Sequence, residues 1–284
     1  MGKRIVSGAI LMSILGAVVL LNLFFPYGMN LVVGALCAWA VYEITNAMGL
    51  AKRWEILLPG MGFALELPLV TSWAISWYLI GACYLLYTLA FFALMLFHHE
   101  KLPFAETAAT FAMTLLIVSA MNCLVYIRDF AGQHAAFYVY MTICASWVSD
   151  AGAYFAGSFW GKHKLCPKLS PKKTVEGVFG GFFLNILAMI VFGVSYNYIF
   201  YGGVLHMSYL SLVLIGLITT VISILGDLSF SFIKRTRGIK DYGTTIPGHG
   251  GILDRFDSVV FVAPFIYFFV QLLPMIVPSA GFFW

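Results

Sequence analysis

Long apolar segments, separated by short polar intervals, repeat along almost the whole of this 284-residue chain. A transmembrane helix needs about 20 predominantly apolar residues, and nine segments reach or approach that length. They lie near residues 5–25, 29–50, 56–70, 73–97, 105–127, 134–158, 177–200, 208–233 and 256–275. The third is the weakest, because it is short and contains Pro59, Glu66 and Pro68. We therefore predict an all-α polytopic membrane protein with about nine transmembrane helices.

The composition agrees with this pattern. The chain is 62% hydrophobic and 10% charged, with a mean hydropathy of +0.94, which excludes an ordinary soluble domain. The five cysteines lack the paired spacing of a zinc site or a disulfide framework. Residues 1–145 contain little beyond apolar segments and are expected to form a scaffold of about five helices. Residues 146–284, with about four helices and two basic loops, are expected to be the catalytic part.

The basic residues are unevenly distributed between alternate loops. With nine spans, 15 of the 16 Lys and Arg residues fall on one side of the membrane, and only Arg128 falls on the other. The positive-inside rule then places the N-terminus and both basic loops in the cytoplasm and Trp284 outside. The net charge of +4 follows from this bias. Because the chain has no nucleic-acid-binding motif, we expect no nucleic-acid partner.

Several acidic residues lie inside the expected spans, where a carboxylate costs several kcal/mol unless it has a partner. Asp227, Ser231 and Lys234 fall at i, i+4 and i+7, so they form one polar stripe on a helix. Asp227 would lie about 10 Å below Lys234. Asp150 begins the second polar segment, and Glu43 could either pair with a neighbouring helix or serve a function.

The segment Ser231–Asp257 concentrates the charge of this apolar chain. It contains Lys234, Arg235, Arg237, Lys240, Asp241, Asp254, Arg255 and Asp257. Basic side chains and backbone amides bind phosphate oxygens, and clustered carboxylates suit a hard cation such as Mg²⁺. Asp254 and Asp257 share a helix face and could converge with Asp227. The alternative is that they cap the helix and pair with Arg255. We predict a phosphate and metal site at a membrane surface.

The turn Gly243–Gly251 cannot be helical, because it contains four glycines and Pro247. Its backbone amides, including those of Gly250 and Gly251, can face an anion. His249 could bind phosphate, transfer a proton or fix the turn.

The other basic loop follows Ser149 and ends near Gly177. Asp150, Gly152 and Gly157 give a polar, closely packed helix face, for which small-residue packing is the alternative reading. The lysines Lys172 and Lys173 follow a proline, and they could serve topology alone. The positive-inside rule explains basic residues in a cytoplasmic loop, but it does not explain an acidic residue inside a span. The presence of Asp150 therefore favours a functional site in this segment.

These motifs resemble those of the phosphatidate cytidylyltransferases, also called CDP-diacylglycerol synthases. The fixed positions of the family signature are filled by Ser231, Lys234, Arg235, Lys240, Asp241, Gly243, Pro247, His249, Gly250, Gly251, Asp254, Arg255 and Asp257. The segment Ser149–Gly177 is similar to the family's second polar segment, with Ser158 where many relatives carry Arg or Lys. The close resemblance covers about residues 146–257.

The resemblance implies a nine-helix membrane enzyme of phospholipid biosynthesis, a nucleotidyltransferase that joins CTP and phosphatidate to give CDP-diacylglycerol and pyrophosphate. It implies magnesium, paired with potassium, and an assembly that is often dimeric. Asp227 and Asp254 match the family's main metal-binding aspartates, and we add Asp257. We expect the protein in a bacterial inner membrane, with its site facing the cytoplasm.

The expected site residues fall into two groups. The catalytic group is Asp227, Asp254, Lys234, Arg235, Lys240, Asp241, His249 and Arg255. The substrate-binding group is Asp150, Lys172, Lys173, Ser231, Gly250 and Gly251, in which the two lysines would receive the phosphatidate headgroup. Two other functions stay open: a CTP-dependent lipid kinase, and an ion-coupled transporter whose buried acids carry ions. Against the transporter, the sequence shows no repeated halves with matching broken helices.

Overall fold

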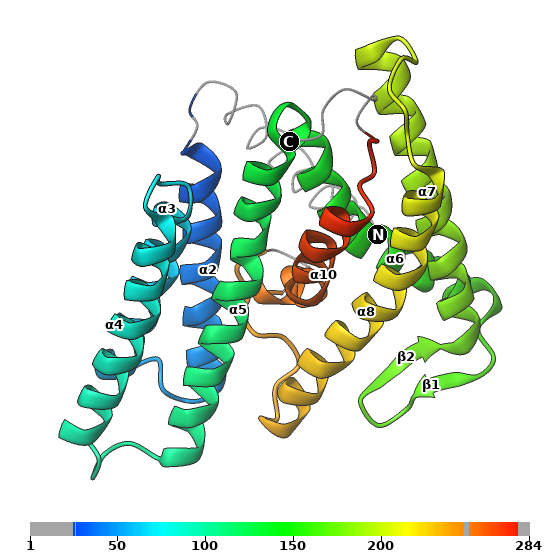
Figure 1. The fold of residues 1–284 in the computed structure, drawn as a ribbon. Helices are drawn as coiled ribbons and strands as arrows, with labels where there is room; N and C mark the ends of the chain where they lie inside the picture. Colours follow the sequence, from blue (N-terminus) through cyan, green and yellow to red (C-terminus); the bar gives the residue numbers. More distant parts are fainter. Residues whose placement is uncertain (1–24, 26, 247–249, 278–284) are drawn as a thin grey trace.

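The computed structural model describes residues 25, 27–246 and 250–277, and helices dominate it (Figure 1). The helices are α2 (Gly28–Ala47), α3 (Trp54–Thr71), α4 (Ser76–Phe97), α5 (Phe104–Ala131), η1 (Gly132–His134), α6 (Ala135–Trp160), α7 (Val175–Tyr201), α8 (Tyr209–Thr236), α9 (Leu253–Phe256) and α10 (Val259–Leu272). Strands β1 (Lys164–Cys166) and β2 (Ser170–Thr174) pair antiparallel between α6 and α7. The helical architecture expected from the apolar pattern is therefore confirmed.

Within the described residues, six helical stretches are long and apolar enough to cross a membrane. One of them, residues 104–160, contains both α5 and α6, which the short η1 separates. Even α3, the weakest expected segment, is a continuous 18-residue helix through its two prolines. The chain is thus a polytopic helical membrane protein. The first expected segment, 5–25, and Trp284 lie outside the described residues, so nine crossings and the orientation of the termini remain predictions.

The last expected segment, 256–275, is shorter than a full span. After the single turn of α9, α10 has 14 residues. At about 1.5 Å per residue this is about 21 Å, less than the roughly 30 Å of a hydrocarbon core. In Figure 1, α9 and α10 begin partway along the bundle, and not at the end where the β-hairpin lies. The start of α10 is therefore recessed from that end.

Most basic loops gather at one end of the bundle. The α2–α3 and α4–α5 connections, the hairpin and the C-terminal end of α8 all lie there (Figure 1). Arg128 lies near the opposite end of α5, where its guanidinium donates to Asn30 Oδ1 at 2.7 Å and pairs with Asp129 at 2.7 Å. Among the described residues, these basic loops therefore share one end of the bundle and Arg128 lies at the other, while Lys3 and Arg4 lie outside the described residues.

Glycines let α6 and α7 pack closely. A Cβ on Gly152 would lie 2.7 Å from the carbonyl oxygen of Gly180, and one on Gly157 would lie 2.8 Å from Thr174 Oγ1. Backbones that approach this closely leave no room for a side chain. Small-residue packing, the alternative reading for this glycine pattern, is therefore confirmed, and it fixes the two helices that carry the hairpin.

The polar interval between α6 and α7, which we expected to be a basic loop, folds as the β1–β2 hairpin. The carboxylate of Glu176, at the start of α7, accepts hydrogen bonds from the backbone N–H groups of Lys162 and His163 at 3.1 and 3.2 Å. Thr174 caps the same helix by accepting from Gly177 N at 3.1 Å. These contacts hold β2 against α7 and fix the position of Lys173, the residue before the cap.

A candidate active site of aspartates and lysines

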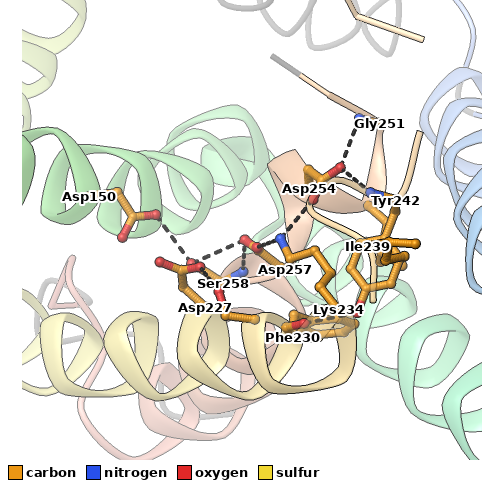
Figure 2. Close-up of polar contacts among 12 residues, drawn as sticks. Asp150, Asp227, Phe230, Lys234, Ile239, Tyr242, Gly251, Asp254, Asp257 and Ser258 are labelled. Carbon is orange, nitrogen blue, oxygen red and sulfur yellow. Dashed lines mark hydrogen bonds and ion pairs between the residues drawn. The ribbon is translucent and has the colours of Figure 1, made fainter. Parts of the chain in front are cut away.

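Four aspartates and two lysines from five places in the chain come together near the starts of α9 and α10. They are Asp150 of α6, Lys173 of β2, Asp227 and Lys234 of α8, Asp254 of α9 and Asp257 just after α9. Figure 2 shows the aspartates on both sides of the Lys234 ammonium, with Asp150, Asp227 and Asp257 on one side and Asp254 on the other. The cluster brings together both polar segments that the sequence singled out.

The polar stripe on α8 forms as expected. Ser231 Oγ donates to Asp227 Oδ1 at 3.3 Å, one turn away, and Lys234 continues the same face. The other oxygen of Asp227 lies 2.6 Å from the ammonium of Lys173. Ser231, which we expected to bind substrate, thus contacts a carboxylate of the cluster. The hairpin supplies the cationic partner of Asp227.

Lys234 is the buried cation of the cluster. Its ammonium lies 2.7 Å from Asp254 Oδ1 and 3.9 Å from Asp257 Oδ2. It also lies 5.2 Å from the centre of the Tyr242 ring, within the range of a cation–π contact. Burial, and then the charges of the two aspartates, raises the pKa of Tyr242, so its hydroxyl stays neutral and donates to the carbonyl of Phe230 at 3.1 Å.

Asp254 joins α8 to the loop that precedes α9. While Oδ1 binds Lys234, Oδ2 accepts from the backbone N–H groups of Tyr242 at 2.7 Å and Gly251 at 2.9 Å. Gly250 has a φ of +85°, which favours glycine, and a Cβ there would lie 2.8 Å from Asp254 Oδ2. The carboxylate is therefore enclosed by the lysine and the loop backbone.

Serine hydroxyls link the remaining carboxylates. Ser223 Oγ and Ser258 Oγ each donate to Asp150 at 3.2 Å, one to each oxygen. Ser258 also donates its backbone N–H to Asp257 Oδ1 at 2.8 Å. Asp150, Asp227 and Asp257 lie within electrostatic range of one another, and like charges at such range repel unless a cation lies near. Asp150, which we expected to bind substrate, belongs to this acidic group.

No three His, Cys, Asp or Glu side chains of the described residues are arranged to hold a single metal ion by themselves. The set of Asp227, Asp254 and Asp257 therefore does not form a ready three-carboxylate site. The donors are nonetheless carboxylate and hydroxyl oxygens, which suit Mg²⁺. This ion is usually held by one or two carboxylates together with waters and substrate phosphates, so the residues present fit it in that form.

The other expected residues surround the cluster with less contact. Lys172, Arg235, Lys240 and Asp241 are exposed. Arg235 donates to the carbonyls of Leu169 at 3.4 Å and Ile239 at 3.2 Å, which ties α8 to the hairpin loop. Arg255 is partly buried, and its Nε has no hydrogen-bond partner among the described residues.

Two residues singled out in the sequence remain, His249 and Glu43. His249 lies outside the described residues, as does Pro247. Glu43, whose role the sequence left open, lies on α2 and accepts hydrogen bonds from the backbone N–H groups of Ile252 and Leu253 at 3.1 and 2.8 Å. The one signal that the sequence offered was the presence of an acidic residue inside an apolar segment.

A bundle of apolar helices that holds a cluster of buried and partly buried carboxylates and lysines is typical of an integral membrane protein with a candidate site for charged ligands. The chain matches the model of the Cytidylyltransferase family over residues 2–273, and it belongs to that family.

Named relatives agree with this membership. The chain is 34% identical over 230 residues to the phosphatidate cytidylyltransferase of Bacillus subtilis (strain 168), which covers 81% of this chain and 80% of the relative. It is 34% identical over 262 residues to that of Staphylococcus aureus (strain COL), which covers 89% and 95%. Over 138 residues it is 44% identical to that of Staphylococcus haemolyticus (strain JCSC1435). The family resemblance drawn from the motifs is therefore confirmed.

Proposed function

We propose that this protein is a phosphatidate cytidylyltransferase, an enzyme that transfers the cytidylyl group of CTP to phosphatidate. The observation that carries the proposal is a cluster of aspartates and lysines inside the helical bundle. The chain that holds this cluster aligns with most of the length of relatives that have this name. The products are CDP-diacylglycerol, the activated lipid for phospholipid synthesis, and pyrophosphate.

The reaction must bring two anions together. A phosphate oxygen of phosphatidate forms a bond to the α-phosphorus of CTP, and the bond from that phosphorus to the oxygen bridging to the β-phosphate breaks. Pyrophosphate takes the electron pair of the broken bond. No general base is required, because a phosphate monoester is already ionised near pH 7. The protein has to neutralise charge and hold the attacking and leaving oxygens in line.

Lysine and arginine side chains supply the neutralising charge. We assign Lys234, Arg235, Lys240 and Arg255 to the phosphates of CTP, and Lys172 and Lys173 to the phosphatidate headgroup. The ion pair between Lys173 and Asp227 supports this assignment, because it brings the hairpin lysines to the carboxylates of α8. The acyl chains would stay in lipid.

We further propose that Asp227 and Asp254, together with Asp257, hold Mg²⁺ against the nucleotide phosphates. The fit rests on an all-oxygen donor set, and on the fact that Mg²⁺ usually takes phosphate oxygens of the substrate as ligands alongside one or two carboxylates. When bound, the ion would stabilise negative charge on the α-phosphate and on pyrophosphate. Ser258 contacts both Asp150 and Asp257. Asp150 would therefore not bind the ion itself but would keep the hydroxyls of Ser223 and Ser258 oriented beside it.

The remaining roles are predictions from the sequence. Gly250 would present its backbone amide to phosphate, and His249 and Asp241 belong to the same loop. The N–H of Gly251, which we expected to do the same, instead donates to Asp254. The basic end of the bundle would face the cytoplasm of a bacterial inner membrane. The potassium ion, the dimeric assembly and the absence of a nucleic-acid partner remain predictions as well.

The test is purification in detergent followed by incubation with phosphatidate, Mg²⁺ and CTP labelled at the α-phosphate. We expect the label in lipid and the release of one pyrophosphate for each lipid labelled. Label recovered in CDP, with the γ-phosphate on a lipid, would identify a CTP-dependent lipid kinase instead. If neither product forms and the protein moves ions across vesicles, the transporter reading replaces both.

A further inference from the structure

The β1–β2 hairpin carries unpaired positive charge on its surface. Four lysines in and beside it are exposed, namely Lys162, Lys164, Lys168 and Lys172. None of them forms a salt bridge within the described residues. Residues 151–175 contain no acid, and Glu176, which follows them, is already bound to the imidazole of His163 at 2.6 Å. The hairpin therefore offers these cations to a partner from outside the chain.

Exposed aromatic rings lie on both helices that the hairpin connects. At the end of α6, Phe159 and Trp160 are 75% and 69% exposed, with ring centres 6.0 Å apart. Near the start of α7, Phe179 and Phe183 are 68% and 71% exposed. Apolar rings on the outside of a transmembrane helix face lipid, and Trp is enriched where the hydrocarbon meets the headgroups. The hairpin that follows Trp160 therefore begins at the bilayer surface.

The two faces of the hairpin differ in what they contact. Successive side chains of a strand point to opposite faces, and Lys173 points to Asp227, 2.6 Å away. Lys172 therefore points to the other face, where it is exposed. Lys164 pairs with Thr174, two residues beyond Lys172, so Lys164 and Lys172 share that face. One face thus reaches the carboxylate cluster, and the other carries free cations.

We propose that the hairpin docks on anionic phospholipid headgroups at the bilayer surface, and that its exposed lysines gather phosphatidate beside Lys172 and Lys173. Charge complementarity supports this occupant, because four or more basic residues directly after a transmembrane helix are typical of segments that bind anionic lipids. Each lysine near such a surface raises the affinity roughly fivefold. The gathering of phosphatidate rests on the proposed function, whereas the docking on anionic lipid does not.

The first experiment measures lipid contact at the hairpin without any reaction. Of the five cysteines, all of which are described, only Cys166 of β1 is not buried, so a neutral fluorescent thiol reagent can label the hairpin. The labelled protein is placed in nanodiscs of phosphatidylcholine, with or without phosphatidylglycerol, and both contain a trace of lipid spin-labelled at the headgroup. We expect quenching to be at least about twofold stronger in the anionic discs, and high salt to remove the difference. Equal quenching in both discs would overturn the proposal.

A pair of double variants tests whether the hairpin lysines cause this contact. Lys164→Gln/Lys168→Gln removes two exposed charges from the hairpin and should abolish most of the difference between the two kinds of disc. Lys52→Gln/Lys101→Gln is the matched control, because it removes two exposed lysines from other loops at the same end of the bundle. The control should keep the parental difference. If it loses as much as the hairpin variant, the overall charge and not the hairpin attracts the lipid, and the proposal fails.

Kinetics test whether the docked lipid includes the substrate. With phosphatidate diluted into phosphatidylcholine vesicles, Lys164→Gln/Lys168→Gln should raise the KM for phosphatidate about tenfold, while kcat and the KM for CTP stay within about twofold of the parent. Glycerol 3-phosphate, which has the phosphate but no acyl chains, should not compete.

An unchanged KM for phosphatidate, or competition by glycerol 3-phosphate, would overturn the gathering of phosphatidate by the hairpin. If the parent makes no CDP-diacylglycerol, the proposed function fails, while the quenching experiment still decides whether the hairpin docks on anionic lipid.

Discussion

Two lysine–aspartate pairs of nearly equal length lie in the same cluster but in different surroundings. Lys234 and Asp254 are 2.7 Å apart, with side chains only 9% and 4% exposed. Lys173 and Asp227 are 2.6 Å apart, with side chains 18% and 26% exposed. The first pair is enclosed by an aromatic ring and loop amides, whereas the second joins the hairpin to α8 and leaves more of both side chains exposed, although the Lys173 ammonium itself is buried.

The difference suggests two roles: the Lys234–Asp254 pair stabilises the fold, whereas the Lys173–Asp227 pair can separate so that each side chain binds another group. Removing one member of a buried pair leaves an uncompensated charge and costs about 3–5 kcal/mol, while a partly exposed pair contributes about 1 kcal/mol or less. Asp227 is thus better placed to release its lysine when ligands arrive. Asp254 holds the loop through two backbone amides, and in the proposed function it would have to do so while it also binds Mg²⁺.

The largest effect is expected for Asp254→Asn. The change leaves the buried Lys234 with only the distant Asp257 as a charged partner, so we expect a loss of about 3–5 kcal/mol in stability and the loss of turnover, with membrane insertion retained. Thermal unfolding in detergent and formation of CDP-diacylglycerol measure the two effects. Adding Lys234→Met should restore much of the stability but none of the activity. A parental melting temperature in Asp254→Asn would contradict the enclosed pair.

The next effect is expected for Asp227→Asn, and on activity alone. Turnover should fall at least about a hundredfold, because a charge that acts in the transition state is lost, while stability changes by about 1 kcal/mol or less. Glu106→Gln is the matched control, since Glu106 and Arg237 form a pair of similar exposure, 30% and 27%, between α5 and α8. It should lose as little stability and keep full turnover. Near-normal synthesis by Asp227→Asn would remove this aspartate from the site.

The smallest effect is expected for Ser258→Ala, which removes the hydroxyl between Asp150 and Asp257. We expect about 1 kcal/mol of destabilisation and a loss of turnover of about tenfold or less. Ser229→Ala is the control, because within the described residues the exposed Ser229 hydroxyl bonds only to the carbonyl of Leu225 on its own helix. Equal behaviour of the two serine variants would show that the link between the carboxylates has no role in catalysis.

The helices were predictable because hydrophobic length is a local property of the chain. α2 through α8 lie within a few residues of the segments expected from the apolar pattern, and the stripe from Asp227 to Lys234 follows from helical spacing alone. The hairpin was not predicted, because its strands are three and five residues long and polar, with no alternating pattern to reveal them.

The candidate site was predictable as a set of residues and less so as a set of contacts. Asp254 and Asp257 lie on the same side of the helix start, as their spacing suggested, but the spacing did not show that Lys234 is the cation they share. That Lys173 pairs with Asp227, however, depends on how the hairpin packs, which no local pattern encodes. The contact of Glu43 with Leu253 joins residues 210 positions apart. A single sequence shows a buried acid in α2, but it does not show which loop that acid will meet.

The depth of Asp227 has a consequence for the lipid substrate. Nine further residues of α8, a rise of about 14 Å, separate Asp227 from the end of the helix at Thr236. With 28 residues, α8 is about 42 Å long, which exceeds the roughly 30 Å of a hydrocarbon core, so its last turns can extend beyond the hydrocarbon and Asp227 can lie near headgroup height. A thicker bilayer would cover those turns and Asp227. In the proposed function, turnover should therefore be faster in vesicles of short-chain lipids than in thick ones.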